Sequence, residues 1–142
     1  MIHYILFRTQ SHVTEDVARV RQALANVLPP ETSIEEEETK GYFDNPIIIL
    51  SARLEKKAAR QYLDFLTSKL PEADLKGLVK EIPERVTGNC DLFFKLSKQD
   101  AYLGDIRTSY AEDSIAIRAR VESYPAKKEI CVNKLEEYFN GR

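Results

Sequence analysis

The sequence has few of the residues from which enzymes build nucleophilic active sites. Its 142 residues include no tryptophan, one methionine, two cysteines and two histidines. A catalytic serine or cysteine needs a base close to it, usually a histidine. Both histidines, His3 and His12, fall in or at the end of one N-terminal segment with strand character. We therefore expect a protein that is not an enzyme and has no catalytic residues.

Motifs for metals and phosphate-bearing cofactors are also missing. Cys90 and Cys131 are far apart and neither has a CxxC partner, which argues against a disulfide framework and a zinc knuckle. We expect both to be buried as small apolar side chains. The acidic run Glu35–Glu38 lacks the glycine and ligand spacing of a calcium loop. No GxxxxGK[ST] or GxGxxG element occurs, so we expect no metal and no cofactor.

No apolar run approaches the roughly 18 residues that cross a bilayer. The start, Met1–Tyr4, lacks the basic residues and apolar stretch of a signal peptide. We therefore expect a cytoplasmic protein with no membrane contact. The 43% apolar and 31% charged composition is that of globular proteins. No linker, repeat or low-complexity segment divides the chain, so one domain over residues 1–142 is expected.

The 21 basic and 23 acidic side chains give a net charge of −2, which is not typical of a dedicated nucleic-acid binder. Acidic residues concentrate in Glu35–Glu38, whereas basic residues are better represented in the last third. Any positively charged surface must therefore be local.

The first half of the chain predicts a strand, a helix and a hairpin. Residues 2–12 are rich in β-formers. A helix is expected from about residue 15 to 28, with Thr14 as its N-cap. Residues 33–40 predict an exposed edge strand, because the run of glutamates leaves no buried face. This strand would pair through a turn with the apolar, β-branched residues 47–54.

Three further helical patterns follow along the chain. Apolar residues recur at helical spacing over 59–70 and 75–82, which predicts two helices broken at Pro71 and ended at Pro83. A last helix would have Pro125 in its first turn.

Two strands complete the expected fold. Residues 92–96 alternate in character, residues 97–104 are expected to be a loop, and residues 115–121 place an apolar stripe opposite Arg118 and Arg120. These arginines would lie about 7 Å apart on one strand face. The fold class is therefore α+β, a sheet packed with helices in the order β-α-β-β-α-α-β-β-α.

Two segments combine basic and aromatic residues with loop amides, a combination that contacts phosphates and stacks unpaired bases. One contains Lys40, Tyr42 and Phe43, and the other contains Lys98, Gln99 and Tyr102. The alternative is that the tyrosines pack these segments onto the core. Arg118 and Arg120 could likewise be ordinary solvated charges.

Four segments resemble one known family: IHYILFRT, EETKGYFDNPI, FFKLSKQDAYLG and YPAKKE. Together, in this order and spacing, they are similar to an archaeal family of small proteins described as predicted exosome subunits or RNA-binding proteins. The resemblance covers nearly the whole chain. It implies a ribosomal protein L5-like fold, association with RNA and a link to the exosome. One departure is the unbroken acidic run before Lys40, which would repel phosphate within a Debye length of roughly 8 Å.

The favoured hypothesis is a non-catalytic RNA-binding protein of RNA processing or degradation. Its candidate RNA-binding residues are Arg8, Lys40, Tyr42, Lys95, Lys98, Gln99, Tyr102, Arg118, Arg120 and Lys127. Most of the basic residues would touch phosphates, the tyrosines would stack on bases, and Gln99 would read a base edge or sugar hydroxyl. The alternative is an adaptor that docks on a larger complex through the sheet edge or acidic run. A nuclease would require a metal cluster or positioned base that the sequence does not display.

Overall fold

The computed structural model describes residues 1–141, with only the backbone of Tyr42. Five strands form one sheet in the order β2-β3-β1-β5-β4, and every neighbouring pair is antiparallel. The strands are β1 (Ile2–Ser11), β2 (Glu35–Lys40), β3 (Pro46–Glu55), β4 (Asp91–Leu96) and β5 (Ile115–Val121). The predicted α+β class is confirmed.

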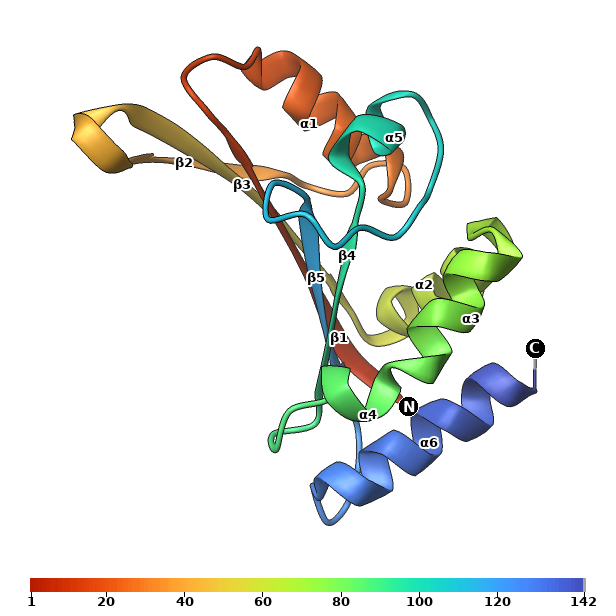
Figure 1. The fold of residues 1–142 in the computed structure, drawn as a ribbon. Helices are drawn as coiled ribbons and strands as arrows, with labels where there is room; N and C mark the ends of the chain where they lie inside the picture. The colour runs from red at the N-terminus through yellow and green to blue at the C-terminus, as the bar shows by residue number, and fades with distance from the viewer. Residues whose placement is uncertain (142) are drawn as a thin grey trace.

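Six helices pack on one side of this twisted sheet (Figure 1). They are α1 (Val17–Asn26), α2 (Lys56–Lys69), α3 (Glu72–Lys80), α4 (Ile82–Arg85), α5 (Lys98–Tyr102) and α6 (Lys128–Asn140). A single 3₁₀ turn, η1 (Tyr42–Asp44), joins β2 to β3. None of the helices in residues 1–141 is long and apolar enough to cross a membrane.

The alternation of apolar and polar residues sets the two faces of the sheet. In β5, Ile115, Ile117, Ala119 and Val121 are buried, whereas Arg118 and Arg120 remain partly exposed. Successive side chains of a strand point to opposite faces, so the helices cover only the apolar face. The predicted inward stripe of β5 is confirmed.

Tyr62 of α2 occupies the centre of the core. Its ring meets Phe7 of β1 edge-on, with 5.0 Å between the ring centroids. Its hydroxyl donates a hydrogen bond of 2.7 Å to the carbonyl oxygen of Val27, so the phenol is buried without an unsatisfied polar atom. Burial raises the pKa of the Tyr62 hydroxyl.

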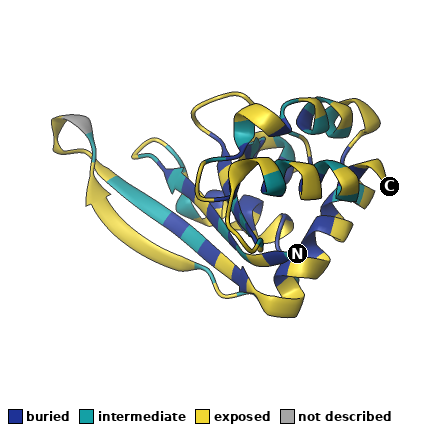
Figure 2. Cartoon of the chain, turned by 90° about the horizontal axis from the view of Figure 1, so that it is seen from below, coloured by how far each residue is buried: buried dark blue, intermediate teal, exposed yellow. Residues whose placement is uncertain are grey.

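The β2–β3 hairpin projects beyond the helices, and every residue of β2 is exposed (Figure 2). The predicted edge strand is therefore confirmed. Glu35, the first residue of β2, pairs with Ser51. The last four residues of β3, 52–55, extend past the end of β2 and form an edge that β2 does not cover.

Two predicted helix boundaries were wrong: the N-cap of the first helix and the helix end at Pro83. The side chain of Asp16, not Thr14, caps α1 by accepting a hydrogen bond of 3.0 Å from the Ala18 amide. Pro83 does not end a helix but lies in the first turn of α4. A first-turn proline is tolerated because its missing N–H has no partner within the helix.

The segment 97–104 is not the loop that was predicted. Residues 98–102 form α5, which Ser97 caps by accepting a hydrogen bond of 3.2 Å from the Asp100 amide. The last helix also begins later than expected, at Lys128, and Pro125 lies outside it after a cis peptide bond.

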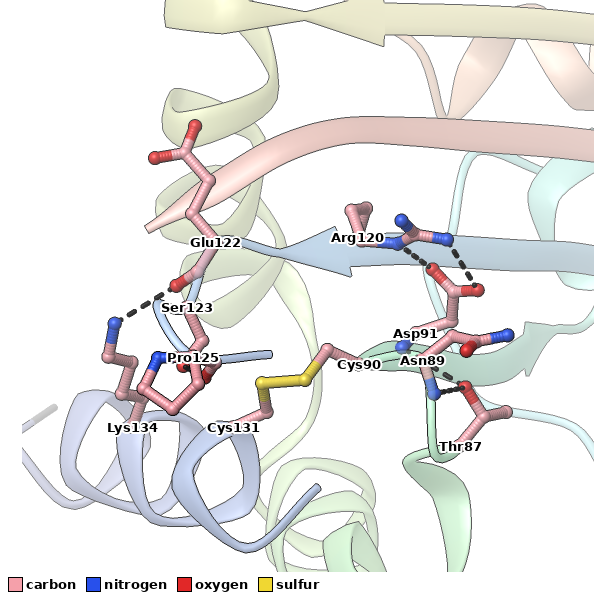
Figure 3. Close-up of a disulfide and its surroundings, with 10 residues drawn as sticks. All are labelled: Thr87, Asn89, Cys90, Asp91, Arg120, Glu122, Ser123, Pro125, Cys131 and Lys134. Atoms are coloured by element: carbon pink, nitrogen blue, oxygen red, sulfur yellow. Dashed lines mark hydrogen bonds and ion pairs between the residues drawn. A yellow bond between two sulfur atoms is a disulfide. The ribbon is translucent and has the colours of Figure 1, made fainter. Parts of the chain in front are cut away.

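Cys90 and Cys131 form a disulfide, which corrects the prediction that no disulfide is present (Figure 3). Both residues are fully buried, as expected. The bond joins the turn before β4 to α6. Each cysteine lacks a nearby sequence partner, so only the packing of α6 beside β4 reveals the pair.

We expect reduction of this disulfide to lower the free energy of unfolding by about 4 kcal/mol, because the bond closes a long loop in the unfolded chain. The two cysteines are 41 residues apart in sequence. Urea unfolding with and without dithiothreitol measures the effect. The double variant Cys90→Ser, Cys131→Ser should show no response to reductant. Identical curves for oxidised and reduced wild type would contradict the prediction.

Candidate nucleic-acid interface

The helices leave one face of the sheet uncovered, here called the open face. It consists of the outward side chains of β1, β5 and β4, namely Tyr4, Leu6, Arg8, Gln10, Ala116, Arg118, Arg120, Asp91, Phe93 and Lys95. Four of these residues are basic and one is acidic. On these three strands the open face is therefore locally positive, although the whole chain carries a net charge of −2. The same side of β3 and β2 adds Arg53 and the carboxylates of Glu55, Glu35 and Glu37.

The strand register brings these residues together in rows. Tyr4 lies opposite Arg120, and Arg120 lies opposite Asp91. One row further along, Leu6 lies opposite Arg118, which lies opposite Phe93. Residues directly opposite one another on antiparallel strands share a face and contact each other.

Asp91 is the buried centre of this arrangement, with 0% of its side chain exposed. Arg118 donates hydrogen bonds of 3.0 Å and 2.6 Å to its Oδ2 atom. Arg120 donates one of 2.6 Å to Oδ1 and one of 3.2 Å to Oδ2 (Figure 3). One carboxylate is thus shared by two guanidinium groups, and the cluster keeps an excess of one positive charge.

These contacts decide the protonation of the cluster. Burial acts to raise the pKa of Asp91, but the hydrogen bonds and charges of Arg120 and Arg118 outweigh it and hold the pKa below its usual value. The hydrogen bond to Asp91 correspondingly raises the pKa of Arg120. Both arginines are therefore held in place by a carboxylate that stays ionised at neutral pH.

Aromatic rings lie under the guanidinium groups. The central guanidinium carbon of Arg118 lies 5.2 Å from the centroid of the Phe93 ring. Those of Arg53 and Arg120 lie 4.3 Å and 5.5 Å from the Tyr4 centroid. Arginine and aromatic planes are the groups on which unpaired bases stack.

The site residues predicted from the sequence do not include Tyr4, Phe93 or Arg53. Alternation along each strand placed Phe93 opposite the apolar stripe of its own strand. Only the pairing of β4 with β5 shows that Phe93 faces Arg118.

Arg8 and Lys95 extend the basic surface toward the other end of the sheet. Arg8 is exposed, and no hydrogen bond or ion pair of its side chain occurs within residues 1–141. The Lys95 ammonium donates a hydrogen bond of 3.4 Å to the carbonyl oxygen of Ala111. Both residues line a cavity of about 400 Å³, whose lining also includes the acidic residues Glu112 and Asp113. Four of the predicted residues, Arg8, Lys95, Arg118 and Arg120, therefore share the open face.

Lys98 is placed differently, because only 8% of the residue is exposed. Its ammonium donates hydrogen bonds to the Gln10 carbonyl oxygen (2.9 Å) and Asp113 (2.7 Å), and forms an ion pair with Glu15 (2.9 Å). Lys98 thus fastens α5 to β1 and to the turn before α1, and it is not available to a phosphate.

The partners of Lys98 also form a group with metal-ligand chemistry. Atoms of His12, Glu15 and Asp113 lie within 4.8 Å of one another. Burial acts to raise the pKa of Glu15, but hydrogen bonds from His12 and Lys98 and the lysine charge lower it to about 2. Because the Lys98 ammonium already binds two of these carboxylates, it takes the role that a cation would have.

The remaining predicted residues lie away from the open face. Gln99 and Tyr102 belong to α5 and line a groove of about 310 Å³ beside α1. By register, Lys40 points to the side of the sheet opposite Arg8. Lys127 directly precedes α6. The side chain of Tyr42 lies outside the described part of the structure. Lys98 and Tyr102 thus do not share a face with Arg118 and Arg120.

The fold and this face together define an α+β protein with a basic, aromatic sheet surface suited to nucleic acid. A family profile described as RNA binding matches residues 4–121. The chain therefore belongs to this RNA-binding family.

Individual proteins show the same similarity. The chain is 36% identical to RNA-binding protein PAB1135 of Pyrococcus abyssi over 145 residues, covering 98% of this chain and 94% of that protein. It is similar to the structure of Mth689, a DUF54 protein of Methanothermobacter thermautotrophicus, with a TM-score of 0.82, 34% identity and coverage of 96% and 97%. The AF2318 structure from Archaeoglobus fulgidus gives a TM-score of 0.88 at 27% identity, with coverage of 96% and 99%.

We expect Asp91→Asn to lower the free energy of unfolding at pH 7 by about 1.5–3 kcal/mol, the contribution of hydrogen bonds to a charged group. The folded-state pKa of Asp91 lies below the usual 3.8, so its stabilisation is complete above that pH and is lost as pH falls further. Denaturant unfolding at pH 7 and pH 3 measures both. The gap between wild type and variant should shrink at pH 3. A gap that stays constant would contradict the assigned ion pairs.

Proposed function

We propose that this protein is a non-catalytic RNA-binding protein that holds RNA on the open face. The observation that carries the proposal is the gathering of four basic side chains and two aromatic rings on an uncovered sheet face of a net acidic chain. Membership of the RNA-binding family supports it, as does the similarity to a protein named for RNA binding.

The open face offers two kinds of contact. Arg8 and Lys95 provide charges for phosphates, which supply most of the affinity and little sequence information. Arg118 and Arg120 are already paired with Asp91, so their flat guanidinium groups serve chiefly as stacking surfaces beside Phe93 and Tyr4. This division of roles favours unpaired RNA over a duplex, whose bases are stacked on one another.

We further propose that the protein is cytoplasmic and works in RNA processing or degradation, with subunits of the archaeal exosome as partners. They rest on the four segments that resemble proteins described as predicted exosome subunits. The likeness to ribosomal protein L5 has the same basis and stays a prediction.

We expect Arg8→Gln to weaken binding to a short unstructured RNA and to reduce the salt dependence of the affinity. Each phosphate neutralised on a single strand contributes about 0.7 to the slope of log affinity against log salt. Fluorescence anisotropy at several salt concentrations gives this slope for wild type and variant.

Arg60→Gln is the matched control, because Arg60 is an exposed arginine of α2 on the helix-covered side. It should leave the slope unchanged. Salt-independent binding by the wild type, or equal losses in the two variants, would count against the open face as the RNA site.

A second candidate function is an adaptor that docks through β2. The exposed carboxylates of Glu35–Glu38 favour it, since such an edge attracts basic partners. Within the described residues, Glu36 is bound by Arg21 at 3.0 Å. However, charged residues also protect edge strands from unwanted pairing, so RNA binding is the function we favour.

We expect Glu37→Gln, Glu38→Gln to leave RNA affinity unchanged or to raise it slightly, because removing negative charge reduces repulsion of phosphate. The same anisotropy assay measures the effect. The adaptor function predicts instead that the variant loses a protein partner from pull-downs while wild type and Arg8→Gln retain it.

A further inference from the structure

We infer that a pocket at one end of the open face binds an unpaired nucleobase of single-stranded RNA, with Tyr124 as its stacking residue. This inference rests on the proposed function, since the pocket would serve the same bound RNA. The pocket measures about 570 Å³, and its lining includes His3, Asn89, Arg120, Tyr124 and Lys134. Of these five residues, Arg120 alone was predicted from the sequence to bind RNA.

The pocket continues directly from the Asp91 cluster. Arg120 belongs to both, and Asn89 lies two residues before Asp91 in the turn that leads into β4 (Figure 3). A strand of RNA that contacts Arg8 and Lys95 at one end of the face would therefore meet Arg118 first and then Arg120 and the pocket. The spacing along β1 from Arg8 to Tyr4 is about 13 Å, at roughly 3.3 Å per residue.

Tyr124 has a side chain that is fully exposed, with a relative accessible area of 102%. Within residues 1–141, no hydrogen bond or ring contact engages it. A large aromatic ring held in water at the rim of a pocket gains apolar contact when a flat ligand covers it. Every base presents a flat face, so such a ring stacks on a base with little sequence preference.

The loop that carries Tyr124 is fastened on both sides. The Ser123 hydroxyl donates a hydrogen bond of 2.8 Å to the Pro125 carbonyl oxygen. The Lys134 ammonium donates one of 3.0 Å to the Glu122 carbonyl oxygen, and the disulfide fixes α6 beside the turn that carries Asn89 (Figure 3). The ring is thus presented by a held backbone, which lowers the ordering cost of binding.

Polar groups of the pocket match a base and its phosphate. The exposed Asn89 side chain offers an amide donor and acceptor for a base edge. The His3 Nδ1 atom lies 3.6 Å from Glu122, which leaves Nε2 of the ring for a ligand. Arg120 and Lys134 supply two positive charges against the one carboxylate of the lining, Glu122. Lys127, predicted from the sequence to touch phosphate, follows Tyr124 by three residues.

The chemistry of the pocket selects a single-stranded ligand. A base can enter only if it is unstacked from its neighbours, which a loop or free strand allows and a continuous duplex does not. The volume lies within the roughly 300–1,000 Å³ of small-ligand pockets. Tyr102, an exposed tyrosine predicted from the sequence to stack on a base, lines the groove beside α1 on the helix side instead.

The test uses a short unstructured RNA in which 2-aminopurine replaces one base, moved through each position in turn. Stacking on Tyr124 should quench its fluorescence at one or two positions. We expect Tyr124→Ala to abolish this quenching and weaken binding about 5- to 150-fold, the range for loss of one base–aromatic stack. Tyr124→Phe keeps the ring and should behave as wild type. Tyr102→Ala is the control for loss of a tyrosine elsewhere.

The outcomes separate this inference from the proposed function. If wild type binds RNA and Arg8→Gln weakens it, but Tyr124→Ala matches wild type in affinity and quenching, the pocket is not a base site and the open face remains. An equal loss in Tyr102→Ala would also overturn the inference. If wild type binds no RNA even at low salt, the inference and the proposed function both fail. Because Tyr124 is fully exposed, its variants should fold, and unfolding curves verify this.

Discussion

The sheet face depends on one buried carboxylate. Asp91 has no exposed side-chain area, yet it lies on the side of the sheet that the helices leave open, because Arg118 and Arg120 cover it. A carboxylate without them would have to be desolvated without a partner, which is costly. Their guanidinium groups are in turn fixed over Phe93 and Tyr4. This ion cluster thereby fixes the positions of two arginine side chains on the open face.

The two sides of the molecule use basic residues differently. On the helix side, the ammonium of Lys98 is enclosed by carboxylates and a carbonyl oxygen, and these contacts join α5 to β1. On the open face, Arg8 keeps its charge in water. Counting basic residues in a segment cannot separate these roles, since burial and partners decide which charge a ligand can reach.

Much of the fold could be predicted from local patterns. The alternation in residues 115–121 fixes both faces of β5, and the glutamates of β2 indicate an edge strand because they have no buried side. The pattern was insufficient where a contact joins distant segments. No local pattern links Asp91 to two arginines; that contact follows from the pairing of β4 with β5. Lys98 was predicted to bind RNA, but Glu15 and Asp113 surround its ammonium. Tyr124 was overlooked because it stands alone in sequence, without a basic neighbour before Lys127.

The covalent bond between Cys90 and Cys131 makes part of the chain a closed ring. This ring contains β4, α5 and β5, and so it carries every basic residue of the open face except Arg8. A protease that cuts once in the long connection between α5 and β5 would open the ring without separating the pieces. Both strands would remain attached to one molecule. Denaturing electrophoresis would separate the two fragments only after the disulfide is reduced.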